Sequence, residues 1–179
     1  QVDLGQTILA GGVGRIIEST VDGWDEGQAV RGGLGAQTIA TVMPKMREKI
    51  DDSAGSLSAH LGALGASTGV TSWIGVRKVA KPQSGDIFVV SAAAGAVGSI
   101  AGQIAKRDGA HVIGIAGGQR KVTHLTERLG FDAGIDYKNE DSKARLRELS
   151  PNGITVFFDN LRGPLVAAVP HHTPLRCGL

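Results

Sequence analysis

The sequence predicts an α/β fold in which a parallel sheet follows a shorter, β-rich stretch. From residue 86 onward, short apolar runs alternate with helical patterns, as strands alternate with crossover helices in a parallel sheet. Residues 1–43 instead contain short β-like pieces separated by glycine turns, and they show no helical period. The two parts of the chain are therefore expected to fold differently.

Residues 86–106, with the sequence DIFVVSAAAGAVGSIAGQIAK, are the predicted entry to a dinucleotide-binding βαβ unit. An apolar run typical of a fully buried strand leads into the fingerprint Ala93-x-Gly95-x-x-Gly98, with alanine at the first glycine position. Gly95 lets the backbone approach a pyrophosphate, Gly98 lets helix and strand pack closely, and the helix N-terminus favours an anion. The pattern predicts a Rossmann-type site, with a small-residue turn of another α/β protein as the alternative.

The end of the second strand, residues 111–115, bears on which dinucleotide is bound. In NAD-binding folds an acidic residue about twenty positions after the glycines binds the ribose 2′-OH. Counting from Gly98 reaches Gly118, which is followed by Arg120 and Lys121 and by no carboxylate. These cations would attract a 2′-phosphate that an acid would repel. The sequence favours NADP(H), with a pair of solvated charges in a first helical turn as the alternative.

The secondary structure of the first half of the chain is predicted mainly from residues typical of turns. The segments expected to be strands are residues 6–9, 15–19, 29–30 and 35–42. Residues 43–56 are charged and interrupted by proline, which indicates a connector. Residues 57–79 carry Leu57, Leu61 and Leu64 at helical spacing and then a second apolar segment, which predicts two packed helices.

The second half continues with alternating elements. These are a helix over residues 119–129, a strand over 133–136, a helix over 140–149, a strand over 154–158 and a fragment of a fifth strand over 175–179. Ligands of such sheets bind at the carboxyl ends of the strands. Residues 93–98 and 117–121, with Tyr137 and Asn160, all follow strand ends, so we expect the site there.

Composition excludes several function classes. The 19 Lys and Arg against 17 Asp and Glu give a net charge of +2, and the cations are dispersed, which does not suit nucleic-acid binding. No apolar run approaches ~18 residues, and no signal peptide is visible. The single Cys177 excludes an internal disulfide and fits a reducing, cytoplasmic location. His171 and His172 adjoin on an extended segment and point to opposite sides, so no metal site is expected.

Several separated stretches together resemble the medium-chain dehydrogenase/reductase superfamily. They are SAAAGAVGSIAGQIAK, AGGQRKVTHLTERLGFDAGIDYK, FFDN and, ahead of these, LSAHLGALGASTGVTSW. More narrowly, the chain resembles the zinc-independent branch of prostaglandin reductases and 2-alkenal reductases over roughly residues 4–160. The resemblance implies part of a GroES-like, β-rich catalytic domain over residues 1–56. It further implies a helical connecting segment over 57–85 and a C-terminally incomplete NADP-binding Rossmann domain over 86–179.

The resemblance also implies an activity, namely NADPH-dependent reduction of the C=C double bond of α,β-unsaturated ketones or aldehydes by hydride transfer. Its substrate would be a small-molecule enone or enal, and a homodimer is compatible with it. The alternative is a truncated or degenerate member that binds NADP(H) without turnover. No residue can be assigned as the general acid from the sequence.

The resemblance carries a set of cofactor-binding residues onto this chain. They are Ala94, Gly95, Ala96, Val97, Gly98, Gly118, Lys121, Tyr137 and Asn160. Residues 94–98 would line the pyrophosphate and Lys121 would hold the 2′-phosphate. Tyr137 would lie by the adenosine phosphate end, with a half-buried structural tyrosine as an equal alternative. Asn160 would lie near the cofactor at the fourth strand.

Overall fold

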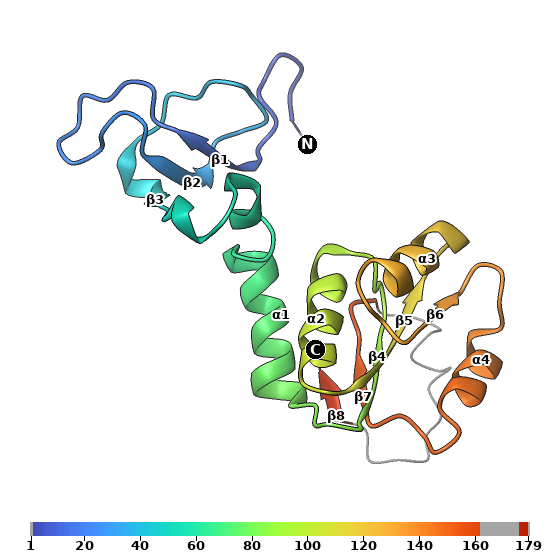
Figure 1. Ribbon diagram of the computed structural model, residues 1–179. Helices are drawn as coiled ribbons and strands as arrows, with labels where there is room; N and C mark the ends of the chain where they lie inside the picture. The colour runs from blue at the N-terminus through green and yellow to red at the C-terminus, as the bar shows by residue number, and fades with distance from the viewer. Residues whose placement is uncertain (1, 162–175, 179) are drawn as a thin grey trace. The chain divides into compact units, whose positions relative to one another are not determined.

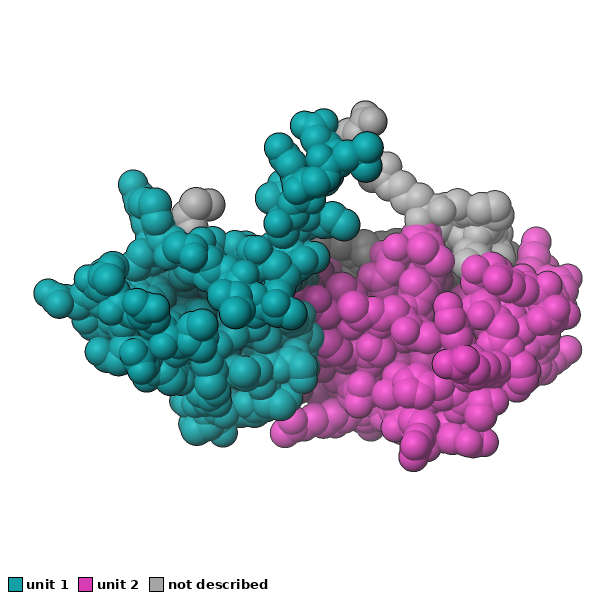
Figure 2. Space-filling model, turned by 90° about the horizontal axis from the view of Figure 1, so that it is seen from above, with its two compact units in different colours: residues 1–67 teal, residues 68–179 magenta. Residues whose placement is uncertain are grey.

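The computed structural model describes residues 2–161 and 176–178 (Figure 1). The chain divides into two compact units between Ser67 and Thr68, shown in teal and magenta in Figure 2. This division falls inside residues 57–85, the segment expected to connect the two halves. Each unit has its own sheet, so the two are described separately.

The first unit contains a three-stranded antiparallel sheet in the order β1-β2-β3. Its strands are β1 (Gly11–Arg15), β2 (Ala29–Gly33) and β3 (Arg47–Lys49). The glycine-rich ends of β1 and β2 face each other, with Gly11 opposite Gly33 and Gly12 opposite Gly32. The strand predicted at residues 29–30 is confirmed, and its two residues are buried.

Other predictions for this unit are wrong. Residues 6–9 and 35–42 form no strand, and of the predicted strand 15–19 only Arg15 lies in one, at the end of β1. The expected connector at 43–56 contains β3 and two short 3₁₀ turns, Pro44–Met46 and Asp52–Ala54. The apolar side chains that suggested strands are largely exposed, as with Leu9 (91%) and Ile39 (69%). A strand needs a ladder of hydrogen bonds as well as an apolar pattern. Residues 35–36 make isolated backbone bonds to residues 8–10, such as the one from the amide of Ala36 to the carbonyl of Ile8 at 3.0 Å, and these do not extend into a ladder.

One helix, rather than the predicted two, follows the first sheet. Leu57–His60 forms only a 3₁₀ turn, and the turns after it include Gly62 and Gly65, which disfavour helix. The helix then runs through a π-helical turn at Ala66–Val70, α1 (Thr71–Ile74) and a second π-helical turn at Gly75–Ala80.

The second unit contains a parallel five-stranded sheet in the order β6-β5-β4-β7-β8. Its strands are β4 (Ile87–Val90), β5 (His111–Ala116), β6 (Ala133–Asp136), β7 (Val156–Phe158) and β8 (Arg176–Gly178). From the central β4 the chain winds outward to β6 and then returns to the other side of β4. This order is that of a Rossmann sheet, and it places the reversal of strand order between β4 and β7. The predicted α/β class and fifth strand are confirmed.

Helices cover both faces of this sheet (Figure 1). They are α2 (Ala96–Arg107), α3 (Gln119–Glu127) and α4 (Ser142–Leu149). One core contains side chains of the π-helical turn Gly75–Ala80, α2 and α3, whereas the core on the opposite face contains Leu146 of α4. The helices of the described residues include none that is long and apolar enough to span a membrane.

The packing of α2 differs from the predicted stripe. Ala101 and Ala105 are buried as expected, but Ile100 and Ile104 are only half-buried and the deepest contacts involve glycines. A Cβ atom at Gly102 would lie 2.1 Å from the Phe131 ring. The helix therefore packs closely through its small residues, here against the ring of Phe131 in the loop before β6.

Candidate dinucleotide site

The turn after β4 has a fixed backbone. Ala92 adopts a left-handed conformation with φ of 46°, which is uncommon for a residue other than glycine. The amide of Ala93 donates to the carbonyl of Ile115 at 3.0 Å, and that of Gly95 donates to the carbonyl of Ala92 at 2.8 Å. These bonds tie the turn to the end of β5 and aim it at the start of α2.

Gly98 lies where this turn meets α2. A Cβ atom at Gly98 would lie 2.5 Å from the carbonyl oxygen of Ala92 and 3.0 Å from the Cα of Ala93. Both contacts are with backbone, which cannot move aside without changing the turn. Gly98 is buried, so its role is close packing, as the fingerprint predicts.

The predicted residues 94–98 run from the turn after β4 into the first turn of α2. Gly95 and Ala96 are exposed, and Ala94 and Val97 are half-buried. Gly95 is the N-cap of α2; no described side chain caps it, and the first turn has no acidic residue. The first amides of a helix have no acceptor inside the helix, so this end of α2 suits an anionic ligand.

The loop after β5 is held by the end of β6. Gly118 has φ of 97°, and its amide donates to Oδ1 of Asp136 at 2.7 Å. A Cβ atom at Gly117 would lie 2.9 Å from the Tyr137 ring, so the missing side chain gives the tyrosine its place. The structure thus brings together Gly118 and Tyr137, and 43% of the tyrosine stays exposed.

Asp136 is the residue of this site that sequence reasoning missed. It is buried at the end of β6, where its carboxylate also accepts hydrogen bonds from the amide of Lys138 at 3.1 Å and from Nδ2 of Asn139 at 2.6 Å. These hydrogen bonds lower the pKa of Asp136, and the bond from the amide of Gly118 contributes most. The only signal in the sequence was a carboxylate at a strand end beside Tyr137.

α3 begins with a second uncapped turn. Its N-cap is Gly118, to which no side chain of the described residues contributes a capping hydrogen bond, and its first turn has no acidic residue. Arg120 and Lys121 lie in that turn and are exposed. Neither forms an ion pair within residues 2–161 and 176–178. The positive charge predicted from the sequence therefore lies at a helix end that already favours anions.

Asn160 lies at the other end of the site. It follows β7, and its Nδ2 donates to the carbonyl of Ser91 at 3.0 Å, so it lies against the start of the β4 turn. Because β4 lies between β5 and β7, Asn160 and Lys121 are on opposite sides of that turn. The predicted residues thus form a row along the carboxyl edge of the sheet rather than a single cluster.

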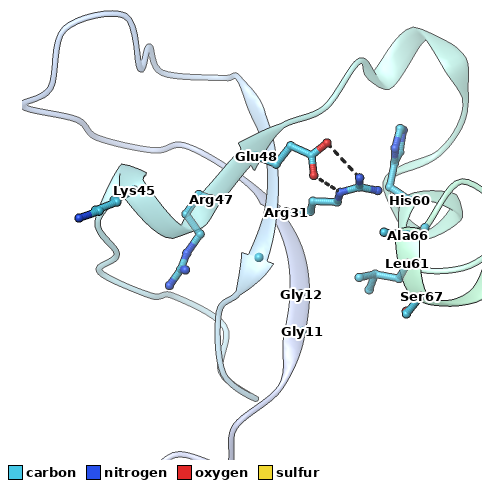
Figure 3. Close-up of a pocket in the computed structure, with 12 residues that line it drawn as sticks. Gly11, Gly12, Arg31, Lys45, Arg47, Glu48, His60, Leu61, Ala66 and Ser67 are labelled. Atoms are coloured by element: carbon cyan, nitrogen blue, oxygen red, sulfur yellow. Dashed lines mark hydrogen bonds and ion pairs between the residues drawn. The ribbon is translucent and has the colours of Figure 1, made fainter.

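A cavity of about 430 Å³ lies within the first unit, between its sheet and residues 57–67 (Figure 3). Arg31 and Glu48 form a cross-strand ion pair there, with Nε–Oε2 and Nη2–Oε1 distances of 2.8 and 3.0 Å, and Arg31 lowers the pKa of Glu48. Lys45, Arg47 and Arg31 point in different directions in Figure 3. Because these cations do not converge, we assign no ligand to the cavity.

The described residues contain no group of three or more His, Cys, Asp or Glu side chains that could hold a metal ion. His171 and His172, weighed from the sequence, lie outside the described residues.

Comparison with known proteins identifies relatives over about nine-tenths of this chain. A family model described as "Zinc-binding dehydrogenase" matches residues 96–171. A Bacillus subtilis (strain 168) protein named as an NADP-dependent oxidoreductase is 43% identical over 162 residues, which cover 90% of this chain and 48% of that protein. The NADP(+)-dependent 2-alkenal reductase of Nicotiana tabacum is 37% identical over 167 residues, covering 92% and 48%.

A solved structure is also similar. The complex of Vibrio vulnificus CurA with NADPH matches with a TM-score of 0.74 and 34% identity, over 90% of this chain and 48% of that one. The chain spans about half the length of the curated relatives it matches. The matching family model is named for zinc, whereas the part of the chain that the structure describes contains no set of three zinc ligands.

Proposed function

This chain belongs to the medium-chain dehydrogenase/reductase superfamily, in the branch of the prostaglandin and 2-alkenal reductases, and we propose that it forms the NADP(H)-binding part of an oxidoreductase. The substrate class we propose is α,β-unsaturated aldehydes and ketones, whose C=C bond is reduced. The name of the tobacco relative, a 2-alkenal reductase, supports this class. The domain division that we propose is 1–56, 57–85 and 86–179, as expected from the sequence.

One observation carries the cofactor assignment. α2 and α3 follow the paired strands β4 and β5, and both begin without a side-chain cap from the described residues. The first turn of α2 is made of small residues, and the first turn of α3 carries Arg120 and Lys121. Two adjacent anion-favouring helix ends, one of them cationic, suit a pyrophosphate and a 2′-phosphate.

Different residues along the sheet edge would bind different parts of the cofactor. Residues 94–98 would hold the pyrophosphate, with Gly98 keeping α2 close to the turn. Lys121, beside Gly118, would hold the 2′-phosphate, and the half-exposed ring of Tyr137 would cover the adenosine end. Asn160 would contact the cofactor on the β7 side. NADPH, when bound, supplies the hydride, and the protein orients it and shields it from water.

The first test compares NADPH and NADH binding to the wild-type chain and to Lys121→Ala, followed by nicotinamide fluorescence. We expect an NADPH preference that the substitution removes, because a lost charged hydrogen bond to phosphate costs ~1–3 kcal/mol, which is about 5- to 150-fold in affinity. The matched control is Lys143→Ala, a lysine in the first turn of the side-chain-capped α4. Equal binding of both nucleotides, or equal losses in both variants, contradicts the proposal.

A second assay addresses turnover. Mixing the chain with NADPH and a 2-alkenal or a simple enone should consume the reduced nicotinamide if the chain is active. Tight NADPH binding without any consumption supports the alternative of a member that binds without turnover, which no comparison favours. We further propose a cytoplasmic location, in keeping with the single Cys177, and a homodimer, which a solution mass measurement tests.

A further inference from the structure

Ser91 is the first residue after β4, and its side chain is fully buried. Its hydroxyl donates a hydrogen bond to Oδ1 of Asp159 at 2.6 Å and accepts one from the backbone amide of Asn160 at 2.7 Å. Both partners follow β7, 68 and 69 residues further along the chain. The hydroxyl therefore acts as donor and acceptor at once, to two successive residues of the neighbouring strand end.

The backbone of Ser91 makes two more bonds to the same segment. Its amide donates to the carbonyl of Phe158 at 3.1 Å, and its carbonyl accepts from Nδ2 of Asn160 at 3.0 Å. Asp159 is held in turn, because its Oδ1 also accepts from the amide of Leu161 at 2.9 Å. Through these bonds the single residue Ser91 fixes both the backbone and the side chain of Asn160.

The orientation leaves part of the Asn160 carboxamide for a ligand. A carboxamide has two N–H donors and a carbonyl acceptor, and the bond to Ser91 uses one donor. Asn160 is exposed, whereas Ser91 behind it is buried. The asparagine thus presents its remaining polar atoms at the carboxyl edge, in a geometry that its buried neighbour imposes.

The position of this pair within the site indicates which part of the cofactor it faces. The strand order reverses between β4 and β7, and ligands of such sheets bind in the crevice at that reversal. With the pyrophosphate on residues 94–98 and the 2′-phosphate at Lys121 on the β5 side, the rest of a dinucleotide extends toward β7. That remainder is the nicotinamide half.

We propose that Ser91 is a positioning residue, which acts through Asn160 to hold the nicotinamide half of NADP(H) and not the adenosine half. This inference rests on the proposed function and deepens it. A structural role alone, such as joining β4 to β7, would stabilise the sheet without distinguishing between the two halves of the cofactor.

The test uses two ligands that differ in the nicotinamide half. NADPH contains both halves, whereas 2′,5′-ADP contains the adenosine and 2′-phosphate only. We expect Ser91→Ala and Asn160→Ala each to lower NADPH affinity about tenfold and to leave 2′,5′-ADP affinity within about twofold. The matched control is Ser150→Ala, which removes a buried serine at the end of α4, away from the site, and should change neither.

The double variant separates positioning from direct contact. If Ser91 acts only through Asn160, Ser91→Ala in the Asn160→Ala background adds little further loss of NADPH affinity. Should Ser91→Ala fail to fold, Ser91→Thr, which keeps the hydroxyl, and Asn160→Ala, at an exposed side chain, carry the test. Ser91→Thr is expected to bind NADPH like wild type.

The outcomes are distinguishable from a failure of the proposed function. Wild-type chain that binds neither ligand contradicts the function itself. Wild-type binding to both, with Asn160→Ala changing both affinities equally or neither, overturns the positioning role alone. Additive losses in the double variant overturn it as well.

Discussion

Three helices begin at the carboxyl edge of the same sheet, but they begin in two different ways. α4 is capped by Asp141, whose carboxylate accepts from the amides of Lys143 at 2.9 Å and Ala144 at 3.2 Å. α2 and α3 begin at Gly95 and Gly118, which have no side chain to offer, and within the described part of the chain no other side chain caps them.

The difference supports the proposal that a ligand binds at one part of this edge. A helix has unsatisfied amides in its first turn, and a glycine N-cap leaves them to water or to a bound anion. Aspartate at this position satisfies them within the protein and adds a favourable charge. The edge is therefore closed after β6 and receptive after β4 and β5, where the fingerprint and the cations lie.

The largest effect on stability and binding is expected at Gly98, which allows the uncapped start of α2 to pack against the turn after β4. Gly98→Val would place its side chain against the backbone of Ala92 and Ala93, with Cβ at 2.5 and 3.0 Å. Overpacking of this kind costs ~1–3 kcal/mol, and the displaced turn should no longer bind NADPH. Urea unfolding and nicotinamide fluorescence measure the two effects.

The control for this change is Gln103→Val, which introduces the same side chain on the exposed face of the same helix. It should cost only a few tenths of a kcal/mol in helix propensity and leave binding unchanged. If Gly98→Val matched this control in both measurements, close packing at Gly98 would not be needed for the site.

At the start of α4, which Asp141 caps, we expect a substitution to change stability without changing binding. Asp141→Ala removes the cap of α4 and should lower the free energy of unfolding by ~1 kcal/mol, while NADPH affinity stays unchanged. Urea unfolding and NADPH titration of the same preparation check both expectations. A loss of affinity would place the start of α4 inside the binding site and remove the contrast between the helix ends.

Introducing a carboxylate into the first turn of α3 is expected to have a smaller effect, which raises stability and lowers NADPH affinity. Gln119→Glu adds a negative charge to its first turn and should raise the free energy of unfolding by ~0.3–1 kcal/mol. The same charge should repel the 2′-phosphate and lower NADPH affinity several-fold more than NADH affinity. Gln103→Glu, in the middle of α2, serves as the control. Stability and affinity changing in the same direction would contradict the assignment of α3 to the phosphate.

Much of this edge could be predicted from the sequence, because local patterns determine it. The strand at Ile87–Val90 is a continuous apolar run, and the glycine spacing marks the turn that follows. The first unit was predicted less well, since β1 is largely glycine and becomes a strand only by pairing with β2. Apolar runs such as residues 35–42 looked more like strands than β1 did.

The links within the site could not be predicted for a related reason. The bond from Gly118 to Asp136 joins residues 18 apart, and the bonds from Ser91 to Asn160 join residues 69 apart. No local pattern encodes such contacts, and they exist only because the strand order brings β5 beside β6 and β4 beside β7. The sequence therefore predicts the local turns of this edge better than it predicts the long-range bonds that hold these turns in place.

The smallest effect concerns the carboxylate that supports the open end of α3 without capping it. Asp136 accepts the amide of Gly118, the N-cap residue itself, and so leaves the first-turn amides to a ligand. Hydrogen bonds from Gly118 and Asn139 lower its pKa, so the folded state gains stability from the ionised form. That gain is complete above the ordinary aspartate pKa of about 4 and is lost as the pH falls through the lowered value.

Asp136→Asn keeps the shape and an acceptor but cannot titrate, so its unfolding free energy should fall less steeply than that of wild type below about pH 4. Between neutral pH and about pH 5 the two slopes should be the same. Urea unfolding at a series of pH values measures this, with Asp141→Asn as the matched carboxylate at the closed helix end. Parallel curves for wild type and Asp136→Asn down to the lowest pH would mean that the Gly118 loop does not depend on the charge. In that case the open end of α3 would be held by backbone geometry and by the Tyr137 ring alone.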